Sequence, residues 1–192
     1  MAVQPVDPDP RWYLADKIGP KLNRRLETYL AVSYFEKMDI PKLQPDLIFP
    51  RLKNTPADID FSFQAKRAAM GPHIMRKWAW DEEFQRNVHF RRYQEKSFFE
   101  ITSAENRLGT VSFQVFPDHV QFGEFYLFPE FQGQGTGSRV LQHCLQLADS
   151  LTLPVRLEYL HWNPVGSLYR RSGFIEIGQS DIHCFMERPI PG

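Results

Sequence analysis

The stretch "GEFYLFPEFQGQGTGSRVLQHCLQLA", residues 123–148, joins two apolar runs of different period through a turn that is rich in glycine. The first run is aromatic and typical of a strand, whereas the second repeats apolar residues at helical spacing. Gly133, Gly135 and Gly137 lie between the two runs. The stretch therefore predicts a strand that ends in a turn and continues directly into a helix.

A junction of this kind attracts anions for two physical reasons. The amide N–H groups of the first helical turn have no acceptor within the helix, and the helix dipole places positive charge at the same end. Because glycine has no side chain, the backbone between Gly133 and Gly137 can approach an anion closely. We therefore expect a phosphate site made of main-chain donors, although an ordinary strand-to-helix turn could contain the same residues.

Two known phosphate-binding loops fit the stretch poorly. A P-loop needs a lysine followed by serine or threonine after its last glycine, and no lysine lies nearby. A dinucleotide fingerprint needs a third glycine where Ser138 stands, and the preceding strands are expected to be antiparallel. Neither nucleotide motif explains the glycines.

Helix punctuation predicts two further helices upstream. Thr55 as an N-cap and Gly71-Pro72 as a stop predict a helix over residues 56–70. Asp81 is expected to begin a second helix, whose arginines, Arg92 among them, are expected to stay in water.

The other apolar runs predict strands with one short helix among them. The expected strands are residues 97–102, 109–116, 119–128, 154–161, 174–179 and 182–188, with a weaker edge strand within residues 46–53. The short helix is expected within residues 164–171, and a helix of about 15 residues is expected within residues 21–40. The turns between the first three strands predict an antiparallel meander.

Composition and charge exclude several classes of protein. The 192 residues include 23 Lys+Arg and 23 Asp+Glu, so no bulk field attracts nucleic acid or an anionic membrane. Cys144 and Cys184 have neither C-x-x-C spacing nor nearby metal-ligand histidines, which predicts buried reduced thiols and no metal. The start "MAVQPVDPDPRW" is unlike a signal peptide, and no long apolar run follows, which indicates a soluble cytoplasmic protein.

The segment "QGQGTG", residues 132–137, fits the pattern Gln/Arg-x-x-Gly-x-Gly/Ala and resembles the pyrophosphate-binding motif of the GNAT superfamily of acyl-CoA N-acyltransferases. Further on, "NPVGSLYRRSGF", Asn163–Phe174, resembles the second motif of that superfamily. The resemblance implies an α/β (α+β) fold with a mixed, mostly antiparallel sheet of six to seven strands, flanked by helices on both faces. It divides the chain into an N-terminal extension with a helix, residues 1–45, and an acetyltransferase domain, residues 46–192.

The resemblance also implies an enzyme that transfers an acetyl group from acetyl-CoA to a primary amine by direct attack, with neither a covalent enzyme intermediate nor a metal. The residues implied to bind acetyl-CoA are Phe125, Leu127, Phe128, Gln132, Gly133, Gln134, Gly135, Thr136, Gly137, Ser138, Asn163 and Arg170. Arg171 is a second candidate for the adenosine phosphates, although both arginines could simply form a solvated helix face. Tyr169 is implied as the general acid that protonates the leaving thiolate.

The same chemistry requires a base, and Glu124 is the best candidate carboxylate, acting directly or through water. The alternative for Glu124 is a strand charge paired across the meander. Trp78 and Trp80, beside the acidic residues 81–83, are predicted to form an acceptor pocket with a negative rim, unless both belong to the core. His183 in the closing hairpin is the third candidate for binding the acceptor.

The expected acceptor is a small-molecule or peptide amine. Neither nucleic acid nor a membrane is expected as a partner, and the protein could form a homodimer. Two other functions stay open. One is a non-catalytic module that binds coenzyme A or a protein partner, which would need neither the Tyr169 hydroxyl nor the Glu124 carboxylate. The other is an oxidoreductase linked to a nicotinamide or a flavin.

Overall fold

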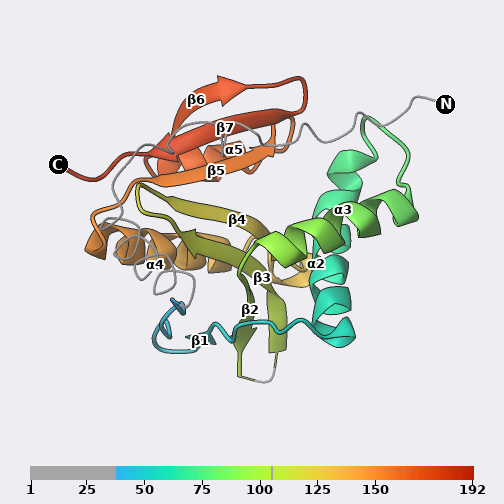
Figure 1. Ribbon diagram of the computed structural model, residues 1–192, viewed down its shortest axis with the longest axis horizontal. Helices are drawn as coiled ribbons and strands as arrows, with labels where there is room; N and C mark the ends of the chain where they lie inside the picture. Colours follow the sequence, from blue (N-terminus) through green and yellow to red (C-terminus); the bar gives the residue numbers. More distant parts are fainter. Residues whose placement is uncertain (1–37, 105) are drawn as a thin grey trace, which may run out of the picture.

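The computed structural model describes residues 38–104 and 106–192, so the predicted N-terminal helix lies outside the described residues. A seven-stranded sheet forms the centre of the fold, in the order β1-β2-β3-β4-β5-β7-β6 (Figure 1). The strands are β1 (Leu47–Ile48), β2 (Phe98–Ser103), β3 (Asn106–Val115), β4 (Val120–Leu127), β5 (Val155–Leu160), β6 (Ile175–Gln179) and β7 (His183–Arg188). Among the strand pairs of the described residues, β4–β5 is the parallel one and the others are antiparallel. The predicted mixed, mostly antiparallel sheet is confirmed.

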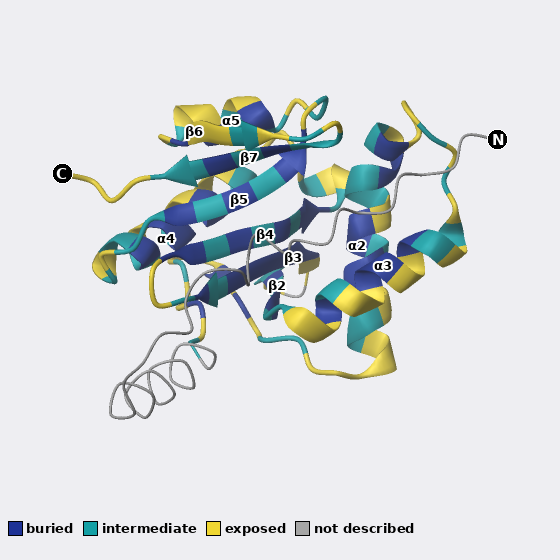
Figure 2. Ribbon diagram, turned by 45° about the horizontal axis from the view of Figure 1, so that its top comes forward, coloured by how far each residue is buried: buried dark blue, intermediate teal, exposed yellow. Residues whose placement is uncertain are grey.

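Helices cover both faces of this sheet. The helices are α2 (Pro56–Ile74), α3 (Glu82–Glu95), α4 (Thr136–Ser150) and α5 (Gly166–Arg171). The Phe98 ring stacks on Tyr93 of α3, with ring centroids 4.7 Å apart, whereas the neighbouring Phe99 belongs to the core that includes Val140 and Leu141 of α4. Because successive strand residues point to opposite faces, α3 and α4 lie on opposite faces of the sheet. Figure 2 shows the resulting buried residues along β3, β4 and β5.

The predicted caps of α2 and α3 are both confirmed. Thr55 accepts a hydrogen bond from the Asp58 amide at 3.2 Å, and Asp81 accepts one from the Phe84 amide at 3.0 Å. The predicted stop at Gly71-Pro72 is wrong, because α2 continues to Ile74. A proline this close to the helix end removes only one N–H donor, and the Met75 amide still donates to the Gly71 carbonyl at 2.9 Å.

The parallel pair β4–β5 is joined over a very short length. Its register contains two pairs, Val120 with Val155 and Gln121 with Arg156, both at the start of the strands. Beyond them the strands no longer pair, and residues 121–127 and 157–160 line a shared cavity instead. The sheet therefore opens between the carboxyl ends of β4 and β5.

A β-bulge in β4 changes which face each side chain reaches. The register with β3 shifts in this part of β4, and Glu124 adopts a left-handed backbone with φ of 43°. Phe122 and Phe125 consequently share a face although they are three residues apart, with ring centroids 5.3 Å apart. Glu124 and Tyr126 point to the other face, toward α2 and α3, where Glu124 meets Arg92. The bulge thus turns a carboxylate away from the core under α4.

Candidate active site

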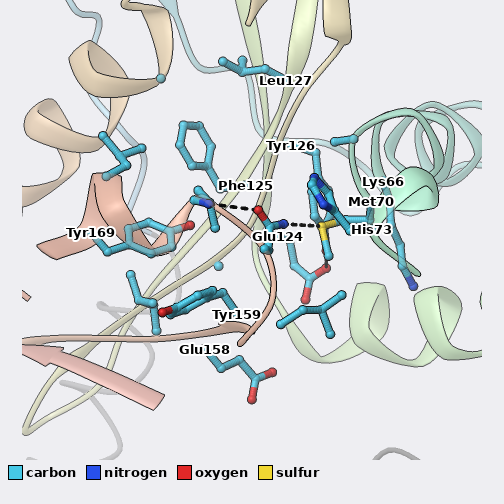
Figure 3. A pocket seen from close by; sticks show the side chains of 18 of the residues that line it. Lys66, Met70, His73, Glu124, Phe125, Tyr126, Leu127, Glu158, Tyr159 and Tyr169 are labelled. Carbon is cyan, nitrogen blue, oxygen red and sulfur yellow. Dashed lines mark hydrogen bonds between the residues drawn. The ribbon is translucent and has the colours of Figure 1, made fainter. Parts of the chain in front are cut away.

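A cavity of about 770 Å³ lies in the opening between β4 and β5 (Figure 3). Its walls come from α2, α3, β4, the glycine loop, β5 and α5. The predicted site residues that line it are Trp78, Glu124, Phe125, Leu127, Gln132, Gly133, Gly135, Gly137, Ser138, Asn163, Tyr169 and His183. Trp80, Phe128, Gln134, Thr136 and Arg170 lie outside the lining. One cavity therefore collects most of the predicted site from segments far apart in the sequence.

The glycine loop presents its main chain to this cavity. Gly133 and Gly135 have φ of 72° and 83°, a left-handed conformation that glycine adopts without strain. Gly135 is the N-cap of α4, and no side chain caps that end of the helix. No heavy atom beyond the chain neighbours lies within 4 Å of the place where a Cβ would stand on either glycine. The first-turn amides of α4 are thus left to an anion, and the loop fits a pyrophosphate.

The glutamine side chains of the loop have a structural role. The Gln132 amide nitrogen donates to the Leu127 carbonyl at 2.7 Å, which ties the loop to the end of β4. The Gln134 amide nitrogen donates to the Glu130 carbonyl at 2.8 Å. Both side chains therefore brace the loop and leave anion binding to the backbone.

The Asn163 side chain also forms structural hydrogen bonds, just before the start of α5. Its Oδ1 accepts a hydrogen bond from the Val165 amide at 3.0 Å, which shapes the turn into the helix. Its Nδ2 donates to the Met70 sulfur at 3.6 Å. Since sulfur is a weak acceptor, the Asn163 amide group is the part of this side chain that a ligand carbonyl could engage.

Tyr169 is buried on α5 with its ring among other aromatic rings. The ring centroids of Tyr159 and Phe174 lie 5.7 and 5.8 Å from that of Tyr169. Burial raises the pKa of the Tyr169 hydroxyl above its usual value, because the charged phenolate is poorly solvated there. The hydroxyl therefore keeps its proton at neutral pH and is able to donate it.

Tyr159 also sets the packing at the start of α5. Its hydroxyl accepts a hydrogen bond from Arg170 at 3.2 Å, which directs Arg170 away from the cavity lining, while Arg171 does line the cavity. A Cβ placed on Gly166 would lie 2.3 Å from the Tyr159 hydroxyl oxygen and 2.6 Å from the ring carbon that bears it. Only glycine fits at this position.

The Gly166→Ala variant is expected to lose about 1–3 kcal/mol of stability through this clash. For a chain of this size, each kcal/mol corresponds to a fall in Tm of about 2–4 °C, which thermal denaturation would measure. The matched control is Gly178→Ala, because its Cβ would meet Phe185 at 3.8 Å, an ordinary contact distance. Equal melting temperatures for the two variants would contradict the close approach of Tyr159 and Gly166.

Glu124 lies in a buried, charged network rather than on an open strand face. Its side chain is 1% exposed, and its Oε1 accepts hydrogen bonds from Lys96 at 2.8 Å and Arg92 at 3.0 Å. The Tyr126 hydroxyl donates to Oε2 at 2.9 Å. Burial alone would raise the pKa of Glu124, but the charges of Lys96 and Arg92 outweigh it and hold this pKa well below its usual value. Of the two cations, Arg92 belongs to α3 and Lys96 is the C-cap of that helix.

Arg92 corrects one expectation of the sequence. It was expected to stay in water, yet its side chain is 22% exposed and also pairs with Glu158 of β5 at 3.3 Å. Lys66 of α2, which is 7% exposed, and Lys96 are further cavity residues that the sequence reading missed. Arg92 and Lys96 follow Val88 at successive intervals of four, so helical periodicity could have placed them on the buried face.

The two tryptophans proposed for the acceptor site separate. Trp78 lines the cavity and packs edge-on against Trp162, with ring centroids 5.2 Å apart. Trp80 packs on Phe63 and donates its Nε1 hydrogen to Glu82 at 2.8 Å. None of the acidic residues 81–83 lines the cavity, so the predicted negative rim is not found there.

In the described residues, 38–104 and 106–192, no group of three or more His, Cys, Asp or Glu is arranged to hold a metal ion. No helix in this part of the chain is long and apolar enough to cross a membrane.

Comparisons with known proteins agree with this geometry. Residues 94–176 match the sequence profile of the acetyltransferase (GNAT) domain, a segment that includes the glycine loop and Tyr169. No curated protein matches the sequence.

Solved structures of similar fold come from several microorganisms. PH1933 from Pyrococcus horikoshii is 18% identical, with a TM-score of 0.61 over 77% of this chain and 100% of that one. The PaiA N-acetyltransferase of Thermoplasma acidophilum, solved in complex with coenzyme A, is 16% identical, with a TM-score of 0.59 over 74% and 99%. The ribosomal-protein-S18-alanine N-acetyltransferase of Escherichia coli is 17% identical, with a TM-score of 0.55 over 76% and 96%. With its splayed sheet and its glycine loop, the described part of the chain has the fold of these acetyltransferases, and residues 94–176 match the GNAT acetyltransferase domain.

Proposed function

We propose that the protein transfers an acetyl group from acetyl-CoA to a primary amine, by direct attack of the amine on the thioester. The observation that carries this proposal is the uncapped N-terminus of α4, whose glycine loop opens onto the cavity between β4 and β5. The solved complex of the related Thermoplasma acidophilum enzyme with coenzyme A supports the choice of co-substrate.

In this proposal the cofactor lies along the opening of the sheet. The amides of the loop around Gly133 and Gly135 bind the pyrophosphate, and Arg171 is better placed than Arg170 for the adenosine phosphates. Among the described residues, β4 forms no ladder pair with β5 after Gln121, so its main-chain groups on that side are available to the pantetheine amides. Phe125 and Leu127 supply the apolar wall.

Tyr169 and Glu124 divide the proton transfers. The amine nitrogen forms a bond to the thioester carbonyl carbon, the C–S bond breaks, and the Tyr169 hydroxyl gives its proton to the leaving thiolate. The proton that the amine loses passes through water to Glu124. Solvent then carries that proton back to Tyr169, so the enzyme is unchanged after each turnover.

The proposed role of Glu124 has a measurable pH dependence. Because Lys96 helps to hold the Glu124 pKa low, Lys96→Met raises that pKa, and the acidic limb of the kcat profile moves to higher pH. A shift of about 1–2 pH units is expected for loss of an adjacent opposite charge. The profile is measured with a weakly basic amine, so that its own titration does not mask the limb. The control is Lys77→Met, an exposed lysine outside the cavity lining, and a limb that does not move in Lys96→Met would exclude Glu124 as the proton acceptor.

Coenzyme A binding provides the direct test of the proposed function. At about a hundred times its Kd, coenzyme A is expected to stabilise the protein by about 2.7 kcal/mol. This corresponds to a rise in Tm of about 5–10 °C, which thermal denaturation of cofactor-free protein would measure. NAD serves as the control, because it has a pyrophosphate but no pantetheine arm. Absence of any shift with coenzyme A or acetyl-CoA would refute the proposal.

An acceptor screen then separates catalysis from binding alone. Acetyl-CoA is incubated with a panel of primary amines, and the release of free thiol is followed. A thermal shift without thiol release for any amine would favour the non-catalytic coenzyme A-binding module instead.

A further inference from the structure

The cavity has an apolar wall on the side of α2 and α3. The side chains of this α2–α3 wall are Met70, Ile74, Trp78, Phe84, Val88 and Ile182. Met70, Ile74 and Trp78 follow one another at intervals of four, and the Trp78 amide donates to the Ile74 carbonyl at 3.0 Å, so helical spacing continues past the end of α2. Phe84 and Val88 have the same spacing on α3. Each helix therefore turns an apolar stripe toward the cavity.

The α2–α3 wall is separate from the apolar surface assigned to the cofactor. A Cβ placed on Gly137, in the first turn of α4, would lie 3.6 Å from Leu127 and 3.8 Å from Phe125. Those two side chains therefore lie beside the glycine loop. The α2–α3 wall comes instead from the helices toward which Glu124 points on the other face of β4. A cofactor bound along β4 and the loop thus leaves this wall to the second substrate.

Contacts with the segment after β5 fix the position of the wall. Trp78 packs edge-on against Trp162, with ring centroids 5.2 Å apart, and the Trp162 Nε1 donates to the His73 carbonyl at 2.9 Å. The Met70 sulfur accepts a hydrogen bond from Asn163 at 3.6 Å. Because Trp162 and Asn163 lead from β5 into α5, the wall is attached to the segment that carries the proposed general acid.

The wall leaves apolar surface uncovered inside the cavity. Ile74 and Val88 are buried, but Met70, Trp78 and Phe84 are each only partly buried although they line a concave site. Ligand sites are typically lined by such apolar side chains together with a few polar groups. Covering this surface with an apolar group of a ligand removes it from water and is favourable.

The charged groups of the cavity lie at a different place. Arg92 and Lys96, at the C-terminal end of α3, both bind Glu124, and Arg92 also binds Glu158. The apolar stripe of α3 belongs to its N-terminal half, and that of α2 belongs to the C-terminal half. An amine can therefore direct its nitrogen toward Glu124 while its carbon chain extends along the α2–α3 wall.

We propose that the acceptor is a primary amine whose amino group is carried by an apolar chain or ring, and that the α2–α3 wall binds this apolar part. The inference rests on the proposed acetyl transfer and specifies its substrate class. It keeps Trp78 in the acceptor site but replaces the negative rim expected from residues 81–83, which would have favoured a second positive charge on the acceptor.

The test compares primary amines that differ at the far end of the carbon chain. Hexylamine, aminopentanol and cadaverine have chains of equal length that end in a methyl, a hydroxyl and an ammonium group, and propylamine is the short member. Wild-type protein is expected to acetylate hexylamine with a kcat/KM at least about thirtyfold above that for cadaverine or propylamine, because the longer apolar chain leaves water. Aminopentanol is expected to give an intermediate value. Thiol release from acetyl-CoA gives the rates.

Variants of the α2–α3 wall assign this preference to its side chains. Phe84→Ala and Trp78→Ala are each expected to lower the ratio of kcat/KM for hexylamine to that for propylamine by about tenfold, mainly through a higher KM for hexylamine. Phe84→Leu, which keeps an apolar side chain, is expected to retain most of the ratio. The matched control is Phe90→Ala, since Phe90 belongs to the same helix but is 50% exposed and outside the cavity lining. The coenzyme A thermal shift verifies that each variant is folded.

Each outcome decides the proposal. A lower ratio in either wall variant, with an unchanged ratio in Phe90→Ala, supports it. It is overturned if wild-type protein acetylates cadaverine or propylamine as well as hexylamine, if none of the amines is acetylated while coenzyme A binds, or if neither wall variant lowers the ratio. These results leave coenzyme A binding intact, so they are distinguishable from failure of the proposed function. Absence of both the thermal shift and thiol release refutes acetyl transfer, and the acceptor proposal falls with it.

Discussion

The Tyr169→Phe variant is expected to lose between about ten- and a thousandfold in turnover, while its affinity for acetyl-CoA stays within about threefold. The reason is that the ring and the hydroxyl have separate roles. The ring packs against Tyr159 and Phe174, and phenylalanine preserves those contacts. The hydroxyl holds its proton because burial raises its pKa, so the proton is available for the thiolate as the C–S bond breaks. Steady-state rates and acetyl-CoA titrations measure the two effects.

The matched control for Tyr169→Phe is Tyr93→Phe. Tyr93 is also buried, and its hydroxyl donates to the Lys53 carbonyl at 2.7 Å, but it does not line the cavity. This control reports the general cost of removing a buried hydroxyl, and its turnover is expected to match wild type. If Tyr169→Phe also turns over at the wild-type rate, Tyr169 is only structural and another group protonates the thiolate.

The Gly135→Val variant is expected to abolish the thermal shift that coenzyme A produces, because its Kd should rise by at least about a hundredfold. A branched side chain would occupy the open space beside the helix N-terminus where the phosphates approach. The same substitution strains the backbone, since Gly135 has φ of 83°. The quantity to measure is therefore the ligand-induced shift within the variant rather than its melting temperature.

Gly173→Val separates strain from ligand binding. Gly173 follows the C-cap of α5 with φ of 89°, close to that of Gly135, and its Cβ would meet Arg188 at ordinary contact distance. Both variants are thus expected to melt earlier than wild type, but Gly173→Val should keep the full coenzyme A shift. A full shift in Gly135→Val would show that the loop does not bind phosphate.

The sequence predicted those features of the fold well that depend on contacts between residues close in the chain. The caps at Thr55 and Asp81 work through one side chain and an amide three residues away, so they can be recognised from a few letters. The glycine loop is equally local. The end of α2 was predicted wrongly because Pro72 removes only one helical hydrogen bond at this position. Tertiary packing compensates for that loss, and the helix continues to Ile74.

The candidate site was harder to predict because it depends on contacts between distant segments. The environment of Glu124 requires the bulge in β4, Arg92 of α3 and Lys96 directly after α3, and alternation within one strand reveals none of these. Arg170 and Arg171 are neighbours on a short helix, so their side chains point about 100° apart. Which of them faces the cavity depends on Tyr159, whose hydroxyl binds Arg170. The prediction of an acidic rim was wrong for the same reason, since Glu82 accepts hydrogen bonds from Trp80 and Arg86 instead.

The short β4–β5 register makes the central sheet behave as two smaller sheets that meet along a seam. One contains β1 to β4, the other contains β5 to β7, and among the described residues the ladder between them has two residue pairs. A ligand that fills the seam would lie where a further strand is missing and would contact both smaller sheets at once. We expect local opening to occur separately in the two halves of the free protein, and as one event in both halves once coenzyme A is bound.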